Sequence, residues 1–182
     1  MSRLGKFDPA KLAPEQRKIY DAIVSGPRGS IGGPFVPWLE SPVLADRAQK
    51  LGEFCRFNTS LPKRLSELAI LVTARYWKAQ FEWYAHERMA REGGLAQPII
   101  DAIRERLPPP GMQDDEKAVY EFASEAYALH YVSNETYQRA VKLLGQQAVV
   151  ELVGILGYYC LVSLTLNIFH VGLPEGETPQ LK

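Results

Sequence analysis

The feature that most constrains the fold of this chain is a long stretch without charged side chains near its C-terminal end. From Leu152 to Leu173 the sequence reads LVGILGYYCLVSLTLNIFHVGL and contains no Asp, Glu, Lys or Arg. A stretch of this length can cross a bilayer, or it can form a helix that is buried on all sides. Two adjacent tyrosines lie at its middle rather than at its ends, and basic flanks that would orient a membrane span are missing. The sequence therefore favours a buried helix at the centre of a bundle or an oligomer.

The other periodic segments of the chain are also helical, because apolar residues recur at helical intervals and no period-two strand exceeds a few residues. Residues 26–42 are rich in glycine and proline, and we expect a long irregular loop there. We expect helices at about 14–24, 42–57, 63–77, 81–94, 96–107, 114–131 and 133–145, ahead of the uncharged helix. The pattern predicts one all-α domain over residues 1–182, with an N-terminal arm at 1–13 and a polar tail at 174–182.

The composition excludes several classes of function. Lys and Arg together number 21, as do Asp and Glu, so no net charge attracts nucleic acid or anionic lipid, and we expect neither partner. The two cysteines, Cys55 and Cys160, form neither a C-x-x-C pair nor a zinc pattern, and we interpret both as buried apolar residues in a reducing compartment. The first residues lack the apolar core of a secretory signal, and we expect a cytoplasmic protein.

The segment FEWYAHE places two chemically useful side chains one helical turn apart. Glu82 and His86 lie four residues apart, and an adjacent carboxylate favours a protonated histidine and fixes its tautomer, as general acid/base chemistry requires. Glu67 lies upstream in an apolar run, where a carboxylate is costly without a partner. One straight helix would separate Glu67 from His86 by about 28 Å, at 1.5 Å per residue. A turn within residues 76–80 would instead bring the three side chains together.

The stretch RLSELAILVTARYWKAQFEWYAHERMAREGGL resembles the core motif of the carboxymuconolactone decarboxylase and alkylhydroperoxidase D-like superfamily. In the redox branch of that family the motif is a glutamate, a C-x-x-C pair and a histidine four residues after the second cysteine. On this sequence the glutamate falls on Glu67, the cysteines on Ala79 and Glu82, and the histidine on His86. The resemblance extends over residues 20–175 and implies an all-α, AhpD-like bundle. It also implies a homo-oligomer, commonly a trimer or hexamer.

Both redox cysteines of the motif are absent from this chain. Peroxide reduction needs a thiolate nucleophile and a resolving thiol, and neither Cys55 nor Cys160 lies at a motif position. The resemblance therefore implies the cysteine-free branch and a lyase that decarboxylates a small carboxylated lactone or organic acid of aromatic compound catabolism. Two alternatives stay open at this point: a thiol-dependent peroxidase, and a non-catalytic binding protein with the same fold.

On the lyase hypothesis His86 carries the proton, and Glu82 and Glu67 orient and tune it. The family's substrates are anionic, so Arg28 in the glycine-rich loop is a candidate to hold a carboxylate. We expect the remaining substrate contacts from Phe81, Trp83, Tyr84 and His170.

We expect neither a metal nor another cofactor. Carboxylate-bridged di-iron bundles use a Glu-x-x-His motif twice. Beyond His86 this chain offers only His130 and His170, and neither has an acidic residue at helical spacing.

Overall fold

The computed structural model describes residues 2–182, and the regular elements in that range are all helices. The helices are α1 (Pro14–Ser25), α2 (Phe35–Trp38), α3 (Pro42–Glu53), α4 (Lys63–Tyr76), α5 (Gln80–Glu92), α6 (Gln97–Glu105), α7 (Asp114–Leu129), α8 (Asn134–Leu144) and α9 (Gln146–Ile168). A short 3-10 helix (Pro9–Lys11) precedes α1, and a π-helical segment (Phe54–Asn58) continues α3. The all-α prediction is confirmed.

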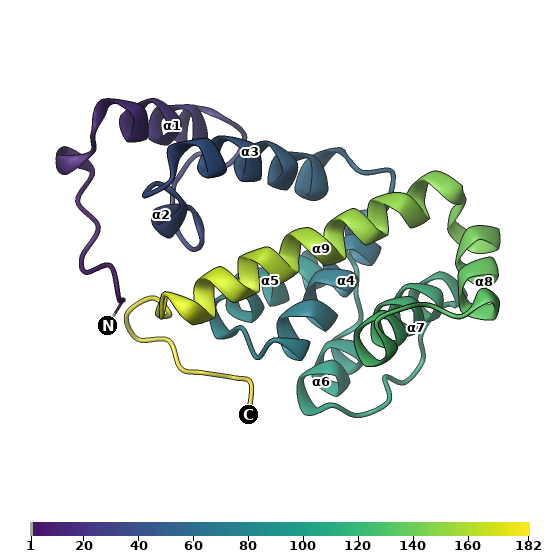
Figure 1. Cartoon of the computed structure of the whole chain (residues 1–182). Coiled ribbons are helices and arrows are strands. Elements are labelled where there is room, and N and C mark those ends of the chain that lie inside the picture. The colour runs from purple at the N-terminus through teal and green to yellow at the C-terminus, as the bar shows by residue number, and fades with distance from the viewer. Residues whose placement is uncertain (1) are drawn as a thin grey trace.

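Helix α9 crosses the whole molecule, with α1, α2 and α3 on one side and α4 to α7 on the other (Figure 1). Helix α4 lies at the centre of the second group and contacts α5, α6, α7 and α9. Every residue of α4 from Leu65 to Arg75 is buried, and this helix therefore forms the axis of the core.

The uncharged stretch near the C-terminus is largely inside this fold. By length and composition α9 could span a membrane, but most of its apolar window is buried against the other helices. The helix begins at Gln146, earlier than the sequence indicates, and ends at Ile168. His170 has a left-handed backbone (φ 51°), and the Val171 N–H donates to the Leu166 carbonyl, which closes the helix end.

The glycine- and proline-rich segment 26–42 is not wholly irregular, and the expectation of a loop without regular structure is wrong at Phe35–Trp38. One turn of helix, α2, forms there. Pro37 is compatible with it because N–H groups in the first turn of a helix have no carbonyl partner within that helix. The Trp38 side chain anchors this turn, since it is buried and donates a hydrogen bond to the Thr165 hydroxyl of α9 (2.9 Å).

The chain reverses between α4 and α5, as the proposed site requires. The Ala79 N–H donates to the Ala74 carbonyl (2.9 Å) and the Lys78 N–H donates to the Arg75 carbonyl (3.2 Å), the hydrogen-bond pair of a Schellman cap. Lys78 occupies the left-handed position of this cap (φ 49°), which glycine fills in most proteins. The cap ends α4 without a glycine or proline, which is why the sequence signal for the turn is weak.

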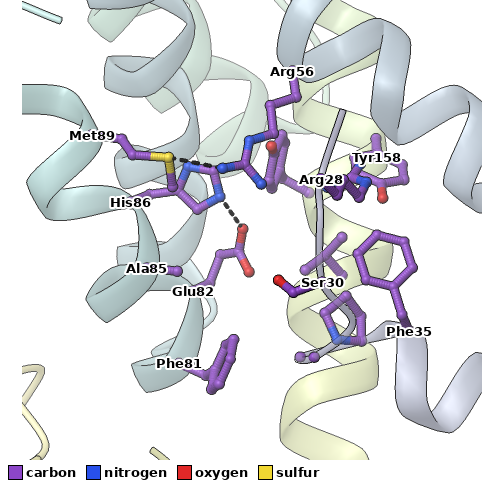
Figure 2. A pocket seen from close by; sticks show the side chains of 15 residues that line it. Arg28, Ser30, Phe35, Arg56, Phe81, Glu82, Ala85, His86, Met89 and Tyr158 are labelled. Atoms are coloured by element: carbon purple, nitrogen blue, oxygen red, sulfur yellow. Dashed lines mark hydrogen bonds and ion pairs between the residues drawn. The ribbon is translucent and has the colours of Figure 1, made fainter. Parts of the chain in front are cut away.

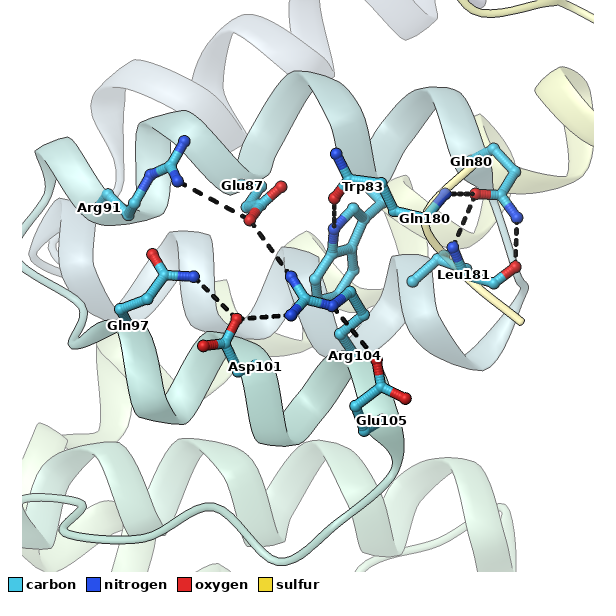
Figure 3. Close-up of polar contacts among 10 residues, drawn as sticks. All are labelled: Gln80, Trp83, Glu87, Arg91, Gln97, Asp101, Arg104, Glu105, Gln180 and Leu181. Carbon is cyan, nitrogen blue, oxygen red and sulfur yellow. Dashed lines mark hydrogen bonds and ion pairs between the residues drawn. The ribbon is translucent and has the colours of Figure 1, made fainter. Parts of the chain in front are cut away.

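The C-terminal tail fixes the start of α5 (Figure 3). The Gln80 side chain accepts hydrogen bonds from the backbone N–H groups of Gln180 and Leu181 and donates one to the Leu181 carbonyl. The indole N–H of Trp83 donates to the Gln180 side chain (3.2 Å), and Leu181 is buried. The tail is therefore part of the packed structure rather than a free polar segment.

The outer face of α5 is held against α6 by Arg104, whose guanidinium lies between carboxylates of both helices (Figure 3). It pairs with Asp101 (2.7 Å) and Glu105 (3.4 Å) on α6 and with Glu87 (3.6 Å) on α5. Helix α5 is thus fixed at its start and along its outer face, and its opposite face is left to form the site described below.

Replacing Lys78 with glycine should raise the free energy of unfolding by about 1 kcal/mol, because glycine adopts the left-handed conformation without the Cβ clash. Urea denaturation measures the change. The matched control is Lys117→Gly in the interior of α7, where glycine should instead destabilise by about 1 kcal/mol. Equal losses at both positions would contradict the assignment of the cap.

Candidate active site

The structure brings Glu67, Glu82 and His86 together into one buried row. His86 Nδ1 lies 2.6 Å from Glu67 Oε2, and His86 Nε2 lies 2.9 Å from Glu82 Oε1. The exposed fractions of Glu67, Glu82 and His86 are 3%, 3% and 5%. A charged imidazole can donate from both nitrogens at once, so this arrangement is complementary to imidazolium.

The positions of the three residues follow from the reversal at residues 77–79. Glu67 lies on α4, whereas Glu82 and His86 lie one turn apart on α5 and face the same side of that helix. The antiparallel packing of α4 and α5 removes the separation that a straight helix would impose.

The two carboxylates determine the charge of His86. Burial by itself would lower the pKa of His86, but the charges and hydrogen bonds of Glu67 and Glu82 outweigh it and raise the pKa to about 9. The ring of Tyr159 packs edge-on against the imidazole at 5.1 Å. His86 is therefore an imidazolium at neutral pH, shielded from bulk water.

A cavity of about 290 Å³ lies beside Glu82 and His86. Figure 2 shows α5 on one side of it and the segment with Arg28, Ser30 and Phe35 on the other. It is lined by Arg28, Ser30, Gly32, Gly33, Pro34, Phe35, Arg56, Phe81, Glu82, Ala85, His86, Met89, Tyr158, Tyr159 and Val162. Its size suits a ligand of one small ring with its substituents.

Glu67 lies on the far side of the row and lines a second hollow of about 320 Å³, together with Lys63 and Ser66. Arg56 and Met89 line both hollows and separate them. The row from Glu82 through His86 to Glu67 thus connects the two hollows.

Two arginines give the first cavity a positive wall. The guanidinium of Arg28 lies over the Phe35 ring at 4.5 Å, and its Nε is buried without a hydrogen-bond partner. Arg56 donates to the Met89 sulfur (3.1 Å). Within residues 2–182 neither arginine forms an ion pair with a carboxylate.

Glycine at position 52 makes room for this wall. A Cβ at Gly52 would overlap the hydroxyl of Tyr158 and approach Arg28 Nη2 to 2.8 Å. Burial raises the pKa of the Tyr158 hydroxyl, although Arg28 lowers it in part. Tyr158 is therefore a neutral hydroxyl next to Arg28.

Of the substrate contacts expected from the sequence, Arg28 and Phe81 line the cavity, whereas Trp83, Tyr84 and His170 do not. Trp83 lies one position after Glu82, on another side of α5, where it is fully buried and bonded to the tail. His170 is exposed at the end of α9, where its backbone closes the helix. These three residues lie outside the cavity, so the expectation that they contact a ligand there is wrong.

The sequence interpretation missed Arg56, Met89, Tyr158 and Tyr159 as lining residues. Tyr158 and Tyr159 were visible as a polar pair inside an uncharged helix, and such hydroxyls usually need a functional or hydrogen-bonding reason. Arg56 was visible as a charge between Cys55 and Phe57. These residues come together because α9 packs against the π-helical segment. The spacing of residues along the sequence does not show this packing.

Neither cysteine belongs to this cavity. Cys55 is fully buried, and burial raises its pKa to about 11, which disfavours a thiolate. The Cys160 sulfur accepts a hydrogen bond from the Trp77 indole (3.2 Å) on another side of α9.

The described residues contain no group of three or more His, Cys, Asp and Glu side chains arranged to hold a metal ion. In the row itself both nitrogens of His86 are engaged by carboxylates, so no imidazole lone pair is free for a metal.

No protein-family model and no curated protein matches this sequence. Solved structures do match. One is a peroxidase-related protein from Ralstonia eutropha JMP134, described as an alkylhydroperoxidase AhpD core, with a TM-score of 0.77 and 15% identity over 98% of this chain and 97% of that chain. Another is a peroxidase-related protein from Silicibacter sp. TM1040, with a TM-score of 0.71 and 11% identity over 89% and 86%.

The debrominase Bmp8 also matches, with a TM-score of 0.70 and 12% identity over 90% of this chain and 88% of that chain. A cysteine-to-alanine variant of Bmp8 in complex with 2,3,4-tribromopyrrole gives a TM-score of 0.71. At these identities the likeness establishes the fold. The chain has the AhpD-like fold, as its resemblance to that superfamily predicted.

The charge of His86 should make stability depend on pH. The ordinary pKa of histidine is 6.5 and that of folded His86 is about 9. Between these values the folded protein keeps a proton that the unfolded chain has released, so the free energy of unfolding should fall as pH rises through this window. Urea denaturation at a series of pH values measures the slope.

In His86→Gln the free energy of unfolding should no longer fall with pH in this window, because no titrating group is left at this position. In Glu67→Gln the fall should be smaller than in wild type, because one of the two carboxylate charges is removed. An unchanged slope in His86→Gln would show that another group causes the dependence.

Proposed function

We propose that this protein is an enzyme that transfers protons to or from a small organic anion, and that its reaction is the decarboxylation of a carboxylated lactone. The observation that carries the proposal is the Arg28 guanidinium, which has no carboxylate partner among residues 2–182 and lines the same cavity as Glu82 and His86 of the buried row. A cation that holds a carboxylate next to a proton-transfer group is what such a reaction requires.

The charges of the cavity support an anionic substrate. The row carries two carboxylates and one imidazolium, a net charge of −1, whereas Arg28 and Arg56 add +2. The remaining charge of +1 on the row and the two arginines together would attract an anionic substrate. Phe35, Phe81 and Val162 supply apolar walls for a ring.

In the reaction, the bond between the ring carbon and the carboxyl carbon breaks, CO2 leaves, and the bonding electrons stay on the ring carbon. That carbon then takes a proton. Glu82 is the group that we assign to deliver it, because its carboxylate points across the cavity toward Ser30 and lies 2.9 Å from His86 Nε2 (Figure 2). His86 passes its Nε2 proton to Glu82, and Glu67 holds the opposite nitrogen.

After Nε2 has given its proton, the neutral ring keeps the Nδ1 proton against Glu67. The bare Nε2 then takes up the next proton through Glu82, which lines the cavity where solvent enters between turnovers. In this proposal Glu82 delivers the proton to the substrate, the role that the sequence suggested for His86. His86 supplies that proton to Glu82.

The alternatives are less well supported. A thiol-dependent peroxidase needs an accessible thiolate, and Cys55 is buried with a raised pKa while Cys160 lies outside the cavity. A binding protein that had lost its chemistry would not need three titratable groups in a buried row beside a cavity, at a cost in desolvation.

The test is conversion of 4-carboxymuconolactone with release of CO2 by the purified protein. Glu82→Gln and His86→Ala should each lower kcat by at least about a hundredfold, since they remove the proton-transfer groups. Arg28→Gln should mainly raise KM. The matched control is Glu92→Gln, at the exposed end of α5, which should keep wild-type turnover. Turnover that survives in His86→Ala would remove His86 from the mechanism.

We also propose that the protein forms a homo-oligomer through the outer face of α9. Residues on this face repeat at seven-residue intervals: the exposed Val150, Gly157 and Leu164 form one row, and the half-buried Gly154 with the exposed Leu161 and Ile168 forms the next. Such a repeat is typical of a helix that pairs with a second helix. The rows contain no charge, so a second copy can pack on them without burying an unpaired ion.

Size-exclusion chromatography with light scattering tests the assembly. Wild type should exceed the 20.5 kDa of one chain, and Leu161→Glu should shift toward the monomer because a charge would lie in the interface. The control is Val43→Glu on α3, an exposed apolar residue outside the two rows, which should leave the mass unchanged. A monomeric wild type would contradict the proposal.

A further inference from the structure

A second arginine without a partner lies at the opposite end of α4 from Glu67. Arg75 is only 8% exposed, and its Nε and Nη1 are fully buried without a hydrogen-bond partner. Within residues 2–182 no carboxylate forms an ion pair with it. A buried guanidinium in this state is costly, because it has lost water and gained no acceptor.

The charges around Arg75 do not relieve that cost. Burial lowers the pKa of Arg75 and the nearby Arg106 lowers it further, while Glu105 offsets the effect in part. Glu105 itself pairs with Arg104 on the other side of α6. Two cations therefore share this region, and within residues 2–182 neither of them forms an ion pair.

Arg75 lines a cavity of about 370 Å³ between α4, α6 and α7. Its other lining residues are Val72, Tyr76, Ile103, Arg106, Tyr120, Ser124, Tyr127 and Ala128. None of them lines the cavity beside His86. The two cavities are thus separate sites on the same central helix.

The walls of this second cavity are aromatic. The rings of Tyr76 and Tyr127 stack at 4.5 Å with an interplanar angle of 13°. The Tyr127 hydroxyl is engaged with Thr73 (2.7 Å), whereas the hydroxyls of Tyr120 and Ser124 make no hydrogen bond within residues 2–182 and can receive a ligand. The cavity combines unpaired cations, flat apolar surfaces and free hydroxyls.

We propose that this cavity is a second binding site, specific for a small organic anion that carries a carboxylate on a planar ring. Arg75 pairs with the carboxylate, and Arg106, exposed at the end of α6, attracts the anion from solvent. The ring packs against the tyrosines. The volume is in the range that holds one such molecule. The site does not depend on the proposed reaction at His86.

The experiment uses benzoate as the probe and benzamide, a neutral molecule of similar shape, as its control. Calorimetric titration of the full-length protein should show benzoate binding and at least tenfold weaker benzamide binding. Arg75→Met should weaken benzoate binding at least tenfold, since it removes a charged hydrogen-bonding partner. The melting temperature of unliganded Arg75→Met should equal or exceed that of wild type, because the buried unpaired charge is gone.

Two further variants separate this site from the first cavity and from a folding defect. Ser124→Leu keeps Arg75 and fills the cavity, and it should also weaken benzoate binding at least tenfold. Arg28→Gln, in the other cavity, should leave the Arg75-dependent binding intact.

Three results would overturn the proposal. The first is that wild type does not bind benzoate. The second is that benzoate binding is lost in Arg28→Gln but kept in Arg75→Met. The third is that the protein self-associates and that Arg75→Met abolishes this self-association. The last would show that a carboxylate from a second copy, rather than a small molecule, neutralises Arg75.

Discussion

The interaction on which the rest of the structure depends is the double pairing of His86 with Glu67 and Glu82. It joins α4 to α5, and it neutralises most of the charge that three buried titratable side chains bring into the core. A buried charge without a partner costs several kcal/mol. The reversal between the two helices, the tail contact at Gln80 and the Arg104 contacts on the outer face all serve to hold α5 where this pairing can form.

The same pairing gives the site its chemical character. Both imidazole nitrogens face carboxylates, so His86 holds its protons between Glu67 and Glu82, and both His86 and Glu82 line the cavity. Arg28 and Arg56 bring the positive charge that an anionic ligand would meet there. Ala79 and Glu82 fall where the resemblance places the cysteines of the redox branch, and the structure pairs Glu82 with His86.

Much of this was predictable from sequence, and the limits have physical causes. The helices were clear from periodicity, and the grouping of Glu67, Glu82 and His86 followed once a turn near Lys78 was assumed. That turn lacks glycine because hydrogen bonds to Ala74 and Arg75 compensate for the strain at Lys78. Helix α2 was missed because proline at its third position looks like a breaker. Trp83 and Tyr84 were misplaced because neighbours in a helix point in different directions.

The central claim is that His86 is an imidazolium held between two carboxylates. Nitrogen NMR of the histidine-labelled protein at pH 7.5 tests it most directly, with His86→Gln used to assign the signals. The account predicts that both ring nitrogens of His86 carry a proton at this pH and that the signals change toward the neutral form only near pH 9. A His86 ring with one bare nitrogen at pH 7.5 would contradict it.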